Sequence, residues 1–151
     1  MKLKAGLIAG FAATVVLSMF MIAKGMMGVM PQLNPIEDIV HVTQSLTGLS
    51  LPPPFGWVGH FVLGTVLWGF LYAALQARVP GTPVVKGLIF GVAAWLVMMI
   101  VFMPLAGHGM FAMSLGPQAA MATLVLHLIF GAVLGLVYAK VARGSSGAGG
   151  G

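Results

Sequence analysis

The sequence predicts an all-α, polytopic membrane protein with four transmembrane helices arranged as two related hairpins. Of its 151 residues, 60% are hydrophobic and only 6% are charged, whereas soluble domains carry about 25% charged residues. Four apolar stretches approach or reach the roughly 20 residues that span a bilayer. Each must be helical, because lipid offers no partners for unpaired backbone groups. In addition, the second half of the chain repeats motifs of the first.

The four expected spans cover residues 5–23, 57–75, 87–103 and 118–139. Lys2 and Lys4 precede the first span, as basic residues precede the core of a secretory signal peptide. Its apolar run is longer than the ~7–15 residues of such a core, and no small-x-small cleavage site follows Ala23. We therefore expect this segment to remain as a spanning helix.

The basic residues predict the orientation of these spans. Six of the seven lie on one side of the membrane if the chain crosses four times, and Lys24 alone lies on the other: Lys2, Lys4, Arg78, Lys86, Lys140 and Arg143. The positive-inside rule then places both termini in the cytoplasm. Aromatic residues near the span ends are typical of interfacial belts, with Trp57 on the outer side and Tyr72 and Tyr138 on the inner side.

The long outer loop after the first span contains a predicted amphipathic helix over residues 35–47. Asn34 is a good N-cap, Pro35 suits the first helical position, and Glu37 stands where a capping box places it. Apolar residues follow at helical spacing, and we expect this helix to lie on the outer membrane surface or over the bundle. The prolines at 52–54 predict a stiff, extended lead into the second span.

Residues 1–143 are expected to form one transmembrane domain. Residues 144–151 consist of Gly, Ser and Ala, and such sequences behave as flexible linkers. We expect a flexible tail there, with a cloning scar as the alternative origin, and assign it no function.

Two internal matches indicate a duplication. Residues 60–73 match residues 127–139 when Trp68 is omitted, because His, Gly, Val, Leu, Gly, Tyr and Ala then recur in order. Residues 6–13 likewise match residues 87–94. Two hairpins of the same topology predict a pseudo-two-fold axis along the membrane normal.

The duplication makes His60 and His127 equivalent, and they are the candidate site. Polar groups within a bilayer are costly and therefore candidates for function. Gly64 and Gly131 follow one helical turn later and could leave room for a ligand, although glycines on a helix face more often serve close helix packing. Three interpretations stay open: hydrogen bonds that fix the bundle, ligation of haem b or a metal ion, and proton or solute handling.

A weaker set of candidate ligands lies in the outer loops: Glu37, Asp38, His41, His108 and Met110. Thioether and imidazole together suit copper(I), but methionine also fills apolar surfaces. Glu37 and Asp38 lie on the same helical face as His41, so local pairing on a solvated face is the simpler interpretation.

The sequence argues against catalysis. The chain has no Cys, no Ser/His/Asp set, no phosphate loop and no acidic residue within a span. The net charge of +5 follows from the cytoplasmic basic residues and does not indicate nucleic acid. We expect a non-catalytic protein in the lipid bilayer whose histidine pair binds haem or a metal. The alternatives are an accessory subunit of a larger complex, a self-associating bundle, and a small transporter or channel that acts as an oligomer.

Four motifs, at residues 5–14, 26–31, 57–60 and 103–107, together resemble a family of small bacterial four-span membrane proteins catalogued only as a domain of unknown function. The resemblance covers the chain to about Arg143. It implies a bacterial inner-membrane protein and brings no known activity, cofactor or site residue.

Overall fold

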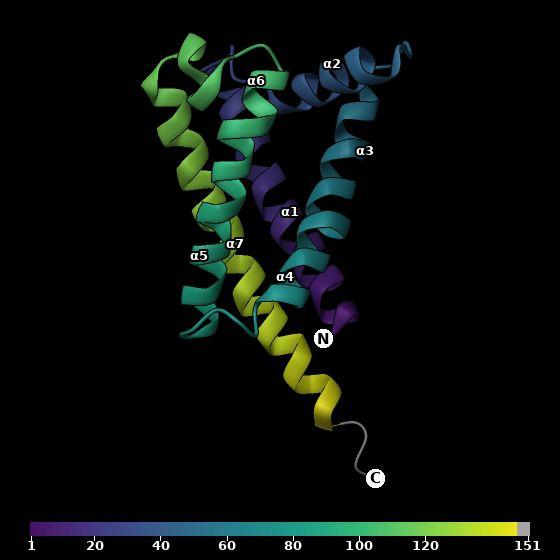
Figure 1. The fold of residues 1–151 in the computed structure, drawn as a ribbon, viewed down its shortest axis with the longest axis vertical. Helices are drawn as coiled ribbons and strands as arrows, with labels where there is room; N and C mark the ends of the chain where they lie inside the picture. Colours follow the sequence, from purple (N-terminus) through teal and green to yellow (C-terminus); the bar gives the residue numbers. More distant parts are fainter. Residues whose placement is uncertain (148–151) are drawn as a thin grey trace.

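The computed structural model describes residues 1–147, and these residues are all helical or in turns and loops, with no strand. Four helices are long and apolar enough to cross a membrane: Leu3–Met26, Pro54–Leu75, Pro83–Leu105 and Pro117–Gly144. Figure 1 shows the start of the first long helix and the end of the last long helix at one end of the molecule, with α2 (Pro35–Thr47) lying across the other end. The predicted all-helical membrane fold with four long apolar helices is confirmed.

Two of the four spans contain π-helical segments. The first span is α1 (Leu3–Met26). The second consists of α3 (Pro54–Val62), the π-helix η1 (Leu63–Trp68) and α4 (Gly69–Leu75). The third consists of α5 (Pro83–Val97), the π-helix η2 (Met98–Phe102) and α6 (Met103–Leu105), and a 3₁₀ segment, η3 (Met110–Leu115), leads to the last span, α7 (Pro117–Gly147).

Local sequence signals explain the ends of α2. The Asn34 side chain accepts a hydrogen bond from the Glu37 amide at 3.4 Å, and Pro35 occupies the first turn. At the other end Gly48 adopts φ +71°, the left-handed conformation that commonly ends helices. The expectation of an extended proline lead is wrong for Pro53, which already has helical angles (φ −52°, ψ −37°) before Pro54 starts α3.

The π-helix η1 lies where the first of the two matching segments has one residue more than the second. The two matching segments align only when Trp68 is omitted, and Trp68 is the last residue of η1. A π-helix closes its hydrogen bonds over one residue more than an α-helix does. The second span therefore accommodates the extra residue locally, and Gly69 and Tyr72 beyond it keep their helical positions.

Glycines bring the helices of each hairpin into backbone contact. A Cβ on Gly10 of α1 would lie 2.8 Å from the Gly64 carbonyl oxygen, and one on Gly69 would lie 2.6 Å from the Gly6 carbonyl oxygen. In the other hairpin, a Cβ on Gly87 of α5 would overlap the Gly131 carbonyl, and one on Gly135 of α7 would lie 3.2 Å from the Gly87 Cα. The glycines that the repeat equates thus make corresponding close approaches in both hairpins.

The four spans are packed unequally. α1 packs against both the second span and α7, and α5 packs against α7. α5 has no comparable backbone contact with the second span. These two meet mainly through aromatic rings, because Phe90 contacts Trp68 at 5.9 Å and Tyr72 at 5.2 Å between ring centroids. The space between the second span and α5 is therefore less tightly closed than the space between α1 and α7.

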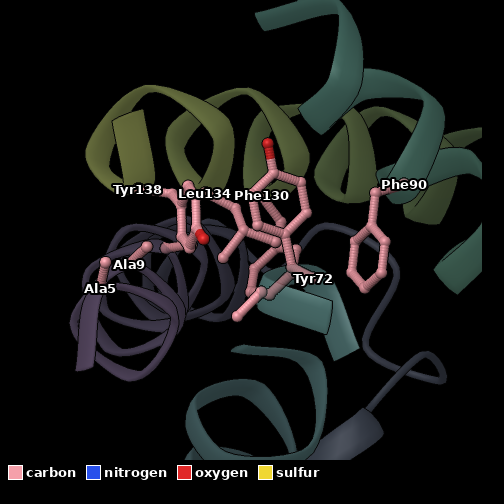
Figure 2. Close-up of a cluster of buried hydrophobic side chains, with 9 residues drawn as sticks. Ala5, Ala9, Tyr72, Phe90, Phe130, Leu134 and Tyr138 are labelled. Atoms are coloured by element: carbon pink, nitrogen blue, oxygen red, sulfur yellow. The ribbon is translucent and has the colours of Figure 1, made fainter. Parts of the chain in front are cut away.

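The main core cluster joins α1, α4, α5 and α7 (Figure 2). Tyr72 and Tyr138 meet edge to face at 5.3 Å, and only 2% and 6% of their surfaces are exposed. The interpretation of these tyrosines as an interfacial belt is wrong, because each ring is covered by neighbouring helices. Gln76 Nε2 lies 3.4 Å from the Tyr138 hydroxyl and gives that polar end a partner.

The last span continues beyond its expected end. α7 is helical to Gly147, so the first residues of the expected flexible tail extend this helix. Residues 148–151 of that tail lie outside the described residues.

Candidate functional site

His60 and His127 line the same cavity, which has a volume of about 250 Å³. His60 comes from α3, His127 comes from α7, and both side chains are half-buried. Most of the wall is apolar, and the side chains with polar groups are Thr14, Lys24, Trp68, Thr123 and the two histidines. The structure therefore brings the two predicted site residues to one largely apolar cavity that is partly open.

The cavity lies where the second span and α5 lack close backbone contact. Leu63, Leu67 and Trp68 line it from the second span, and Ala94 and Val97 line it from α5. α1 and α7 supply the remaining walls, and α1 is visible between α3 and α5 in Figure 1. Leu33, Pro35 and Ile39, which belong to the outer loop and α2, cover the outer end.

Residues that the internal repeat equates line this cavity together. The match pairs His60 with His127 and places four pairs of equivalent positions on the wall: His60 and His127, Leu63 and Phe130, Leu17 and Met98, and Met21 and Phe102. If the two hairpins are repeats, as the sequence predicts, this cavity lies between them, where internally duplicated membrane proteins often hold a ligand.

Hydrogen bonds determine which nitrogen of His60 carries a proton. Its Nε2 lies 3.1 Å from Ser18 Oγ, and the Ser18 hydroxyl donates its own proton to the Thr14 carbonyl at 2.7 Å. With the Ser18 proton on the Thr14 carbonyl, Ser18 Oγ accepts from His60 Nε2. In a neutral imidazole this leaves Nδ1 of His60 with a free lone pair.

His127 is fixed in the opposite tautomer. Its Nδ1 donates to the Thr123 carbonyl at 2.8 Å, so Nε2 keeps the lone pair in the neutral ring. Thr123 is itself held in place, because Trp95 Nε1 donates to Thr123 Oγ1 at 3.2 Å and to the Ala120 carbonyl at 3.1 Å. Metal-binding histidines show this arrangement, in which one nitrogen donates to a carbonyl and the other binds the metal.

The side chains that line the cavity include soft donor atoms and carry no negative charge. No Asp or Glu is among its lining residues, whereas the thioethers of Met21 and Met98 are. Lys24 carries the one formal positive charge and lies toward the outer end, where its Nζ donates to the carbonyls of Met30 (3.0 Å) and Leu33 (2.6 Å). The space therefore offers neutral nitrogen and sulfur donors to a ligand.

The sequence matches a known protein family over residues 1–147. The chain belongs to DUF6789, a family of unknown function. The expected resemblance to a domain of unknown function is confirmed. No curated protein and no solved structure matches this DUF6789 chain.

Gly64 and Gly131 do not leave open space for a ligand. A Cβ on Gly64 would overlap the Thr14 side chain, and one on Gly131 would overlap the Gly87 carbonyl. Gly64 lines the cavity beside His60, but its bare face is occupied by α1. Both glycines thus serve close helix packing, because a neighbouring helix fills each vacant Cβ position.

The outer candidates lie apart from the cavity. Asp38 pairs with His108, with 2.9 Å between Oδ1 and Nε2, and its other oxygen is buried without a hydrogen-bond partner. Glu37 and His41 are exposed on α2. The expected pairing within α2 is wrong for Asp38, whose partner lies 70 positions away in the sequence. Met110 is 49% exposed, and the described residues contain no group of three His, Asp or Glu side chains able to hold a metal.

Sequence reasoning missed the residues that orient the two imidazoles. Ser18 and Thr123 are the polar residues nearest to each histidine in the bundle, and both are buried. A hydroxyl within an apolar span was the available signal, but Ser and Thr commonly bond back to their own helix, as both do here.

Proposed function

We propose that this DUF6789 protein is a non-catalytic membrane protein that binds a metal ion between His60 and His127. The observation that carries the proposal is that both imidazoles line one apolar cavity, each with one nitrogen engaged as a donor. The remaining lone pairs, on His60 Nδ1 and His127 Nε2, are the proposed ligands. Oriented imidazoles of this kind are common metal ligands in proteins.

Copper(I) fits this donor set best. Soft thioether ligands favour copper(I), and Met21 and Met98 line the same cavity as the imidazoles. A divalent ion would bring two charges into a space without a carboxylate or thiolate to balance them, and burying unbalanced charge is costly. A monovalent soft ion needs less compensation.

Haem b is the weaker alternative within the same ligand class. Two axial histidines suit haem iron, but for scale an apolar cavity of about 150 Å³ binds benzene. The present cavity of about 250 Å³ is small for a macrocycle of four pyrroles. Haem would require the second span and α5 to separate further.

We place the protein in a bacterial inner membrane with both termini in the cytoplasm. Four apolar helices support a multi-pass protein in lipid, and the start of α1 and the end of α7 lie at the same end of the bundle (Figure 1). The excess of Lys and Arg on that end supports a cytoplasmic location.

Anaerobic titration with copper(I), against a chelator of known affinity, tests the proposal. The purified protein is expected to take up equimolar copper, and His60→Ala and His127→Ala are each expected to lose it. His41→Ala is the matched control, because His41 is exposed on α2 and lines no described cavity. Equal copper uptake by all four proteins would contradict the site. Folded protein without any uptake would favour an accessory role with packed histidines.

A further inference from the structure

A second cavity lies on the outer side of the molecule, beside the first. Its volume is about 330 Å³, and its wall consists mainly of the end of α1, the loop that follows, and the start of α2. Four residues line both cavities: Met21, Lys24, Leu33 and Pro35. The polar side chains of the outer cavity are Lys24, Asn34 and Trp57.

All three of these side chains present hydrogen-bond donors. The Lys24 ammonium has three N–H groups and uses bonds to two carbonyls, those of Met30 and Leu33. The Asn34 oxygen accepts from the Glu37 amide, so its NH₂ group points elsewhere. Within residues 1–147, no protein acceptor bonds to that NH₂ group or to Trp57 Nε1.

The outer cavity also carries an unbalanced positive charge. The described residues contain one ion pair, between Asp38 and His108, and Lys24 takes no part in it. Glu37 and Asp38 belong to the adjoining first turn of α2, but neither lines the cavity. A cavity with a cation, several free donors and no acidic side chain is chemically complementary to an oxyanion.

The surroundings indicate that the oxyanion belongs to a lipid. Lys24 lies near the outer end of a membrane-spanning helix, at the depth where lysines reach the head groups. Exposed apolar side chains flank the cavity, namely Ile22 (51% exposed), Met26 (84%) and Val29 (47%). These side chains can pack against the acyl chains of a molecule whose head group occupies the cavity.

We infer that the outer cavity binds the phosphate head group of an anionic phospholipid, with Lys24, Asn34 and Trp57 donating to its oxygens. This inference does not depend on the proposed metal site, because none of the three residues is a proposed metal ligand. Trp57 nevertheless contacts His60 edge to face, with 6.0 Å between ring centroids. The Trp57 side chain would thus lie between a bound lipid head group and the His60 imidazole.

The test compares lipid retention by the full chain after exchange into phosphatidylcholine with and without phosphatidylglycerol, measured by native mass spectrometry. The wild-type protein is expected to retain phosphatidylglycerol in preference to phosphatidylcholine. Lys24→Gln removes one charge-assisted contact to the phosphate inside the cavity and is expected to reduce that preference about fivefold. Lys4→Gln removes the same charge from the opposite end of α1, where Lys4 is exposed and lines neither cavity, and should change nothing.

Asn34→Asp is the sharper variant, because Asp caps helices as well as Asn does. It should leave thermal stability unchanged while replacing two donors with a negative charge, and phosphatidylglycerol retention should fall. Equal retention by wild type, Lys24→Gln and Asn34→Asp would overturn the inference. Displacement of the lipid by inorganic phosphate alone would also overturn it, in favour of a site for free phosphate.

Discussion

Ser18 and His60 form the contact that presents the first imidazole to the cavity, with 3.1 Å between Oγ and Nε2. With its proton on the Thr14 carbonyl, Ser18 accepts from His60 Nε2. The contact holds the His60 ring in this orientation, and this pairing favours the Nε2-protonated tautomer. On α7 the backbone carbonyl of Thr123 plays the same part for His127, with the opposite nitrogen.

Ser18→Ala should weaken metal binding without unfolding the protein. The variant removes the acceptor that orients His60, and loss of such a supporting hydrogen bond typically lowers metal affinity by about 10- to 100-fold. Competition for copper(I) with a chelator of known affinity measures the change in metal affinity. Ser45→Ala is the matched control, because Ser45 also bonds back to its own helix, at Val42, but lies on α2 away from the histidines. Unchanged affinity in Ser18→Ala would argue against His60 as a ligand.

Gly87→Ala should destabilise the second hairpin. The added methyl group would overlap the Gly131 carbonyl, so α5 and α7 would have to separate, and overpacking of this kind costs about 1–3 kcal/mol. The midpoint of thermal unfolding in detergent should fall. Gly25→Ala is the control, since nothing lies within 4 Å of a Cβ at Gly25. If both variants melted at the wild-type temperature, the close approach of α5 and α7 would be refuted.

Asp38 and His108 should attach α2 to the loop before η3. His108→Ala leaves a buried carboxylate without a partner and should cost about 3 kcal/mol, whereas Asp38→Ala removes the buried charge and should cost less. Asp38→Ala combined with His108→Ala should therefore be more stable than His108→Ala alone. Thermal unfolding and protease access to residues 48–53 measure these effects. A double variant less stable than either single variant would contradict this account.

The orientation can be tested directly because the chain has no Cys. Ser50→Cys and Ala77→Cys place single, exposed thiols at opposite ends of the bundle. A membrane-impermeant maleimide added to intact cells should label Cys at position 50 and leave position 77 unlabelled until the membrane is opened. The reverse pattern would mean that the termini face outward.

The fold was largely predictable because the membrane simplifies the problem. Long apolar runs must be helices in lipid, and the signals around Asn34, Pro35 and Gly48 are local, so the composition and those few residues determine much of the architecture. The tyrosines show where this reasoning fails. Tyr72 and Tyr138 lie near span ends, where either an interfacial or a buried position is possible. Only the packing of α4 against α5 and α7 decides between the two.

That His60 and His127 line one cavity was predictable from the sequence, but the groups around them were not. Polar side chains within a span identified His60 and His127, and the repeat paired them. The close helix packing at Gly64 and Gly131 was not predictable, because a glycine looks the same in the sequence whether a ligand or a helix fills its bare face. The pairing of Asp38 with His108 was also not predictable, since His108 lies in a different loop and the local spacing favoured His41.

The most direct test of the central claim is an absorption spectrum, oxidised and reduced, with metal analysis of gently purified protein, its His60→Ala and His127→Ala variants, and the His41→Ala control. The account predicts stoichiometric metal, with copper foremost, in the wild type and His41→Ala, and its loss in both His60→Ala and His127→Ala. A Soret band lost in the same two variants would keep the histidine pair but replace copper with haem. Metal-free, colourless wild-type protein that also fails to take up added copper(I) would contradict the claim.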